Sequence, residues 1–257
     1  MEEKHRLGGM ALTNGVLVHG PTSWACAIRM KDGELKVVAR RKRVIGSTLR
    51  SPFLRGPAKF VESIAFLPEI KLALPEAELP FMRGNVAGAM VASAAAIHSI
   101  RRTRLSGTAK EVLAGVLSIA PAVLSLREGA VAAYHGAEHI TIGTYEHGTQ
   151  RTREHERCGT HLVGPLLATG AAGNALAARM PERFRSAARA AASVGALAAS
   201  TEIFAWMQRN PDHVVARALA KPGHEFQHRL ATEEPTRDQL DVAEAALRAC
   251  LELEDAA

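Results

Sequence analysis

Metal-capable side chains gather in two short stretches of this 257-residue chain. The first stretch, His135-Gly136-Ala137-Glu138-His139, places two imidazoles four residues apart. If the stretch is helical, both imidazoles project from one face and can reach the same metal ion through neutral ring nitrogens. Glu138 lies beside them and is a candidate general base for water at the metal, or a further ligand. The alternative is a polar helix start whose three groups face solvent.

The second stretch follows within about two dozen residues and contains His155 and Cys158. Thiolate and imidazole together suit zinc or iron. The alternative for Cys158 is a small buried side chain at the start of a helix. We therefore predict a site for a divalent metal, with zinc favoured and iron or manganese as alternatives. In this site His135 and His139 are joined by His155 or Cys158.

Two more residues are candidates for the same site. The H-x-x-E-H order of the first stretch is that of inverted zincins, which take a third ligand from a later helix. Glu202 lies inside an apolar segment, where an ionisable group is expensive unless it is paired or functional, so it is a candidate ligand. The alternative is a structural partner for an arginine. Arg55 follows a proline turn and is a candidate for holding an anionic group of the substrate.

The elements that must position these residues differ along the chain. Residues 8–40 contain short β-rich runs and an Asp32-Gly33 turn, which predict an antiparallel meander. Beyond residue 50 the pattern becomes helical. Pro222-Gly223 and the following residues through Gln227 to Pro235 predict an ordered loop, and the last stretch has the spacing of an amphipathic helix. We predict an α+β fold, mostly α: a β-rich segment at 1–50, a helical bundle carrying the metal site at 51–235, and an amphipathic helix at 236–257. The bundle comprises four Ala-rich apolar helices, at 84–100, 112–126, 162–178 and 188–207.

The four apolar segments raise the question of a membrane. A span needs about 20 mostly apolar residues, and three of the segments are shorter than that. The chain is 47% hydrophobic but only 4% aromatic, so alanine supplies much of its apolar content. A four-helix membrane bundle and a soluble all-helical core built on alanine both remain open from the pattern. Small residues four apart, such as Gly84 and Gly88, permit tight helix pairing and a homo-oligomer.

Charge and cysteine content narrow the classes further. The formal charge is +6, with basic runs at 40–43 and 101–104. These runs suit anionic lipid or a solvated loop, and no aromatic platform interleaves them, so we expect no specific nucleic-acid partner. Three scattered cysteines do not make a disulfide framework, and the side that carries the thiols is expected to be intracellular. The sequence contains no Walker or Rossmann glycine loop and no nucleophile elbow around a serine.

The order of these motifs resembles the YqhQ-like family, an uncharacterised bacterial group described as metal-dependent enzymes and expected to be multi-pass membrane proteins. The resemblance runs along nearly the whole chain. Asn14 and Glu156 depart from it, since the family usually has a glutamate and a proline there. The motifs that carry it are Gly8-Gly9 with Gly15-Val16, Pro52 to Gly56, Tyr134 to His139, Tyr145-Glu146, His155 with Arg157 to Thr160, and Pro222-Gly223 followed by Gln227, Thr232 and Glu234-Pro235. The resemblance implies a metal site and a membrane location, and it implies no substrate.

The leading hypothesis is a metal-dependent hydrolase acting on an unknown small-molecule or lipid-like substrate. One alternative is a non-catalytic membrane-associated scaffold with a structural metal site. The other is an iron-dependent redox enzyme in a helical bundle. We expect the chain to be membrane-associated or integral to the membrane, with its thiols facing the cytoplasm. The alternative location is the cytoplasm.

Overall fold

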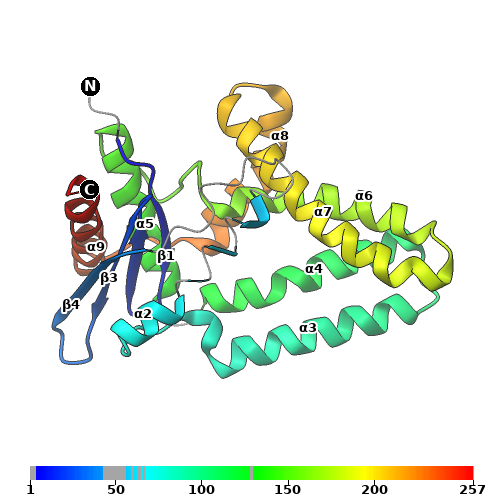
Figure 1. Cartoon of the computed structure of the whole chain (residues 1–257), viewed down its shortest axis with the longest axis horizontal. Helices are drawn as coiled ribbons and strands as arrows, with labels where there is room; N and C mark the ends of the chain where they lie inside the picture. Colours follow the sequence, from blue (N-terminus) through cyan, green and yellow to red (C-terminus); the bar gives the residue numbers. More distant parts are fainter. Residues whose placement is uncertain are drawn as a thin grey trace.

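The computed structural model describes residues 4–42, 56–58, 61–62, 65, 67–127 and 130–256. Within these residues a four-stranded sheet and a group of helices stand at one end, and four long helices extend away from them (Figure 1). The predicted fold class, α+β and mostly α with an N-terminal antiparallel meander, is confirmed. Arg55 lies outside the described residues.

The sheet is a meander in the order β1-β2-β3-β4, with every neighbouring pair antiparallel. Its strands are β1 (Gly8–Ala11), β2 (Gly15–His19), β3 (Ser23–Arg29) and β4 (Leu35–Arg41). The turn between the last two strands includes Gly33, whose φ of 89° lies in the left-handed region that glycine adopts at no steric cost. The predicted Asp32-Gly33 hairpin turn is therefore present.

Alternation along β2 and β3 sends side chains into two separate cores, because successive residues of a strand point to opposite faces. Val16, Val18, Ala25 and Ala27 pack under α5 (Val131–His147) and α9 (Arg237–Asp255). The opposite face packs against α2 (Leu67–Ala73) and the segment after it, through Leu17, Trp24, Cys26, Ile28, Ile70 and Leu74. The central strands are thus buried on both faces, which explains why they read as nearly continuous apolar runs.

The end of α9 is fastened to the sheet through Glu254. Its carboxylate accepts hydrogen bonds from the backbone N–H groups of Thr22 and Ser23 at 2.9 and 2.7 Å, and from both hydroxyls. Burial alone would raise the pKa of Glu254, but the hydrogen bonds from Ser23 and Thr22 outweigh it and lower the pKa. The charged form of Glu254 therefore stabilises the fold.

Replacing Glu254 with glutamine is expected to destabilise the protein by about 1.5–3 kcal/mol at neutral pH, since charge-assisted hydrogen bonds to buried donors are lost. Because the folded-state pKa is lowered, this contribution is present above the unfolded pKa of about 4.3 and disappears as the pH falls through the folded value. Thermal unfolding of the wild type and Glu254→Gln between pH 7 and 3 measures both effects. Glu252→Gln, an exposed change on the same helix, is the control. Equal melting temperatures for Glu254→Gln and wild type at pH 7 would contradict the assignment.

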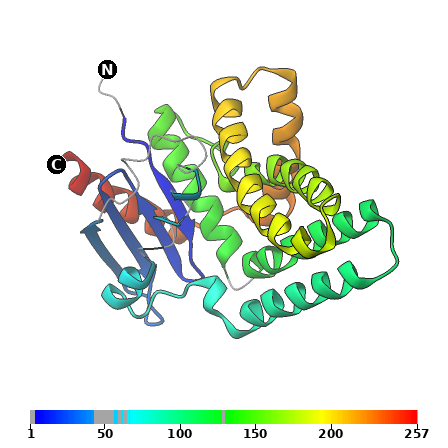
Figure 2. The same ribbon diagram turned by 45° about the vertical axis from the view of Figure 1, so that its right-hand side comes forward.

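Two helical hairpins extend from the sheet end of the molecule, and we call them the arms. Helices α3 (Gly84–Arg102) and α4 (Gly107–Leu126) form one arm, and α6 (Val163–Ala178) and α7 (Glu182–Arg209) form the other (Figures 1 and 2). The Ser106 hydroxyl caps the start of α4 by accepting from the backbone N–H of Ala109. The four predicted apolar segments correspond to these four helices. Helices α3, α4 and α7 extend beyond the predicted segments, and α6 begins one residue later than predicted.

The segment between the arms and α9 differs from its prediction. Pro222-Gly223 suggested an ordered loop, but residues 214–226 form α8 (Val214–Phe226) with Pro222 inside it. The π-helix η3 (Gln227–Ala231) follows directly. A proline in a helix removes one backbone hydrogen bond, yet α8 continues through Pro222 to Phe226. A short helix η2 (Gly159–Leu162) packs against α8 and leads into α6.

Candidate metal centre

Helix α5 carries the first motif and is enclosed on several sides. It packs against β1, β2 and α9, and η3 contacts it as well. Gly136 lets the chain after η3 lie directly on this helix, because a Cβ at that position would stand 2.2 Å from the carbonyl oxygen of Glu233. The Glu233 N–H in turn donates to the carbonyl of Ala132. The glycine inside the motif therefore has a packing reason: it allows the chain after residue 231 to approach the histidines.

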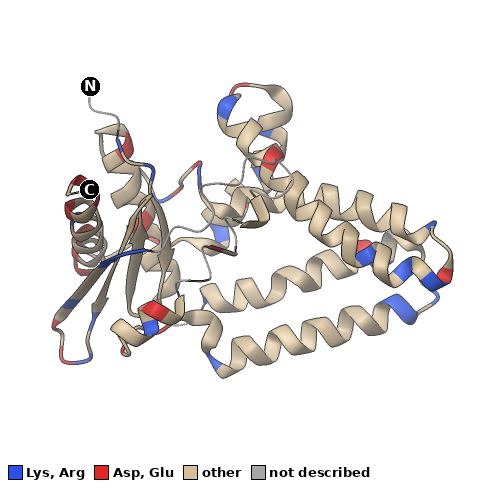
Figure 3. Ribbon diagram, in the orientation of Figure 1, with Lys and Arg blue, Asp and Glu red and all other residues tan. Residues whose placement is uncertain are grey.

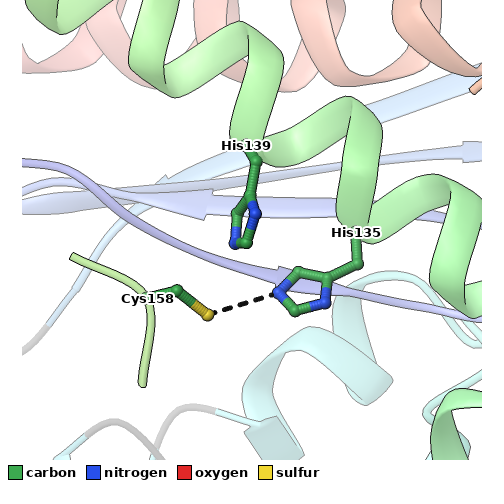
Figure 4. Close-up of side chains that lie close together, drawn as sticks. All are labelled: His135, His139 and Cys158. Carbon is green, nitrogen blue, oxygen red and sulfur yellow. Dashed lines mark hydrogen bonds between the residues drawn. The ribbon is translucent and has the colours of Figure 1, made fainter. Parts of the chain in front are cut away.

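Three potential ligands converge beside α5. The ligand atoms of His135, His139 and Cys158 all lie within 4.8 Å of one another, and the Cys158 Sγ is 3.5 Å from His135 Nε2 (Figure 4). The two imidazole centroids are 4.2 Å apart. Tetrahedral zinc with ordinary bond lengths sets nitrogen and sulfur ligands about 3.6 Å apart. The arrangement could therefore hold a metal ion.

Both histidines are oriented by backbone carbonyls. The Nδ1 of His135 lies 2.8 Å from the carbonyl oxygen of Ala231, and the Nδ1 of His139 lies 2.6 Å from that of Arg153. A neutral imidazole that donates through Nδ1 keeps its lone pair on Nε2. Both Nε2 atoms thus carry the lone pair that a metal ion needs. A hydrogen bond from the other ring nitrogen to a backbone carbonyl is typical of metal-binding histidines.

The electrostatic environment keeps His139 neutral. Burial lowers its pKa, and neighbouring His135 acts in the same direction, while hydrogen bonding with Cys158 and Arg153 opposes the shift. Only neutral imidazole binds a metal ion. A buried histidine that resists protonation therefore stays available as a ligand over a wide range of pH.

Glu138 lies next to this cluster but outside it. Its Oε2 is 4.0 Å from His135 Nε2, and the side chain is only 9% exposed. Strand β1 passes directly behind the carboxylate, and a Cβ at Gly9 would stand 2.4 Å from Glu138 Oε1. Burial raises the pKa of Glu138, and the nearby His135 and His155 partly offset the rise. The Gly8-Gly9 motif thus gains a structural role, because it leaves room for this side chain.

Cys158 reaches the histidines through a loop that Gln227 holds in place. The side chain of Gln227 is fully buried in η3; its Oε1 accepts from the backbone N–H of His155 at 2.9 Å. Its Nε2 donates to the His155 carbonyl, to the Thr160 hydroxyl at 2.7 Å and to His161 Nδ1 at 3.0 Å. One amide therefore fixes both ends of the segment that contains Cys158. Sequence reasoning named Gln227 only as part of a loop, and its buried hydrogen bonding leaves no trace in the local sequence.

The other predicted site residues lie in different surroundings. His155 is close to His139, with ring centroids 5.5 Å apart, but its nitrogens contact Glu146 Oε2 at 3.1 Å and the N–H of Arg157. Glu146 also pairs with Arg157 at 3.0 Å. His155 thus belongs to a hydrogen-bonding network with Glu146 and Arg157 beside the cluster. Glu202 lies half-buried on α7 and is not part of the cluster that the structure shows among its described residues.

Part of the chain is similar to a family without an assigned function. Residues 127–253 match the model of a family described as protein of unknown function (DUF1385). The match covers just under half of the chain, from the residue after α4 into α9, and it includes all three members of the cluster. No curated protein matches the chain, and no solved structure matches it either.

Proposed function

We propose that this chain is a membrane-embedded, metal-dependent hydrolase whose metal is held by His135, His139 and Cys158. The observation that carries the proposal is the pair of imidazoles whose Nδ1 atoms contact backbone carbonyls, with the Cys158 thiol 3.5 Å from His135 Nε2. Three protein ligands with a carboxylate beside them are the composition of catalytic zinc sites, whereas structural sites commonly fill all four positions with protein ligands. Zinc is favoured, and iron or manganese is the alternative.

The donor set fits a transition metal on the chemistry of its atoms. Imidazole nitrogen and thiolate sulfur together select zinc or iron over magnesium or calcium. When bound, such an ion supplies Lewis-acid polarisation of a substrate oxygen and lowers the pKa of water. The chain's own residues position that water's proton acceptor, so the protein determines where the chemistry takes place.

In this proposal Glu138 accepts the proton of the attacking water. The carboxylate lies next to the ligands, is shielded from bulk solvent and is backed by β1 at Gly9, so it has little freedom to turn away. A general base contributes about 10²–10⁴ in rate when it is held within reach of the proton that it removes. Arg55, predicted to hold an anionic group of the substrate, stays a prediction.

The arms support the membrane part of the proposal. Among the described residues, two helical stretches are long and apolar enough to cross a membrane, Ala109–Leu126 and Glu182–Arg209. Only 6% of the first and 22% of the apolar window of the second is buried, although a core helix of a soluble protein buries a whole face. Val91, Val116, Leu176 and Val194 are each more than 60% exposed along the arms.

The distribution of charged residues along the arms also supports a membrane location. The middle parts of the arm helices carry almost no charge, and Lys and Arg gather at the far ends (Figure 3). A helix of 20 residues is about 30 Å long, which matches the hydrocarbon thickness of a bilayer. The far ends contain Arg101, Arg102 and Arg104 on one arm and Arg179, Arg183 and Arg185 on the other. Basic ends of this kind suit the headgroup layer.

A Glu138→Gln variant tests the hydrolytic role. We expect it to keep the metal at wild-type stoichiometry, because Glu138 is not one of the three ligands, and to lose about 10²-fold or more of the hydrolytic rate. Elemental analysis measures the first, and a panel of chromogenic carboxylic and phosphoric esters measures the second. Glu225→Gln, an exposed change at the end of α8, is the matched control.

Two results would separate the alternatives. Full activity in Glu138→Gln would remove the general-base role. Loss of the metal from Glu138→Gln would make the carboxylate a fourth protein ligand, which is the composition of a closed structural site. That second result would replace the hydrolase with a scaffold whose metal ties α5 to the loop of Cys158.

A further inference from the structure

A cavity lies beside the loop that carries Cys158. It has a volume of about 420 Å³, within the range of small-molecule sites, and it lies between that loop, the end of α7 and α8. Its polar lining includes Arg157, His161 and Arg217, and the apolar part includes Met207 and Ala216. None of these residues belongs to the His135–His139–Cys158 cluster.

The hydrogen bonding of His161 shows which atom it offers to this cavity. The Gln227 Oε1 accepts from a backbone N–H, which fixes the orientation of the amide, so Gln227 Nε2 is the donor to His161 Nδ1. A neutral imidazole that accepts at Nδ1 carries its proton on Nε2. The imidazole also lies within hydrogen-bonding reach of the Cys158 backbone, and the side chain is only 6% exposed. His161 is therefore a buried donor held in one tautomer.

Two guanidinium groups complete a set of donors around the cavity. Arg157 comes from the same loop, and its NH1 lies 3.0 Å from Glu146 Oε1. Arg217 lies on α8, is exposed, and makes no ion pair with any residue that the structure describes. The donors thus come from separate segments, with His161 buried and Arg217 at the surface. Donors that surround a ligand from several sides suit a tetrahedral oxyanion.

The lining of the cavity also contains one carboxylate. Glu156 also borders the cavity, but its oxygens pair with His147 Nε2 at 3.1 Å and with Arg151 NH2 at 3.5 Å. Its charge is therefore offset by groups outside the cavity. Among the residues that line the cavity, the cationic and donor groups outnumber the acidic one.

We propose that this cavity binds a phosphate group, with Arg157 and Arg217 as its cationic contacts and His161 Nε2 as a neutral donor. The site is separate from the metal cluster, and the proposal does not rest on the hydrolase. The phosphate comes either from a soluble phosphorylated molecule or from a lipid headgroup, since α7 belongs to an arm and ends at the cavity.

The test is isothermal titration of the detergent-solubilised full chain with inorganic phosphate, at physiological chloride. We expect saturable binding that weakens by about tenfold or more in Arg217→Ala, partly recovers in Arg217→Lys, and tightens in Glu156→Gln. Arg237→Ala, an exposed arginine on α9, is the control and should bind like the wild type. Absence of phosphate binding, together with no binding of phosphatidic acid, would overturn the proposal. The proposal would also be overturned if Arg217→Ala bound both phosphate and phosphatidic acid as tightly as the wild type does.

Two further titrations identify the source of the phosphate and separate this cavity from the metal cluster. Titration with phosphatidic acid in nanodiscs, beside phosphatidylcholine, shows whether the lipid headgroup binds more tightly than the free ion, and either order supports the phosphate site. Phosphate can also bind to a metal ion directly, so the titration is repeated with His135→Ala/His139→Ala. Retained binding there, lost on adding Arg217→Ala, supports the cavity. Binding that depends on the two histidines and not on Arg217 places the anion at the metal and overturns the cavity.

Discussion

Elemental analysis of a His135→Ala/His139→Ala variant is expected to show no bound transition metal, whereas the wild type, purified without chelator or polyhistidine tag, carries about one ion per chain. Cys158 alone is left in the variant, and one thiolate does not hold a divalent ion against solvent. Binding also stabilises the folded state, by about 4 kcal/mol when the free metal is at a thousand times its dissociation constant. Added zinc should therefore raise the melting temperature of the wild type and leave that of the variant unchanged.

The same double change also removes two hydrogen bonds to buried carbonyls, at Ala231 and Arg153, so some loss of stability is expected without any metal. Cys158→Ser separates the two effects, because it keeps both imidazole contacts and removes only the soft ligand. We expect it to fold like the wild type and to bind zinc much more weakly. His98→Ala/His224→Ala removes two exposed histidines and is the matched control. Wild-type metal content in His135→Ala/His139→Ala would place the site elsewhere.

Lysine substitution on the arms distinguishes a bilayer from water as their surroundings. Val116 and Val194 are 64% and 63% exposed near the middle of α4 and α7. On a protein surface in water, Val116→Lys/Val194→Lys changes stability by only a few tenths of a kcal/mol per site. In the centre of a bilayer each lysine costs about 2.5–3.5 kcal/mol. We expect the wild type to stay in the membrane pellet after alkaline carbonate extraction and the double variant to show strongly reduced insertion and yield.

Val214→Lys is the matched control, because Val214 is 66% exposed but lies at the start of α8, outside the arms. It should fractionate like the wild type. Release of the wild type by carbonate, or a double variant that stays soluble and folded with unchanged yield, would show that the arms do not lie in lipid.

Much of the fold could be predicted because turn residues and hydrophobic periodicity act over only a few residues of sequence. The Asp32-Gly33 turn and the short β-rich apolar runs of β2 and β3 specify a meander, and the long alanine-rich runs specify the arm helices. Helix α8 was missed because Pro222-Gly223 has the composition of a turn, and only the tertiary structure shows that the helix passes through it. Periodicity also carries no information on which face of the sheet receives α9.

Prediction of the candidate site depended on how far apart its parts lie in the sequence. The spacing of His135 and His139 on one helix face is a local property and was predicted. The choice between His155 and Cys158 depends on a loop whose shape is set by Gln227, 72 residues after His155. The partner of His135 Nδ1 lies 96 residues away at Ala231. Contacts between residues so far apart in the chain cannot be derived from one sequence, so both His155 and Cys158 remained candidates.

The order in which a ribosome makes the chain bears on when the centre can form. His135 and His139 emerge early, after the first arm, but the carbonyl that orients His135 belongs to Ala231. The amide that holds the Cys158 loop belongs to Gln227, so it too appears late. Both arms are therefore synthesised before the residues that fix the ligands. A chain that is almost complete is therefore the first that presents the oriented cluster to a metal ion, and a product truncated before η3 has both histidines and the cysteine but lacks the contacts that orient them.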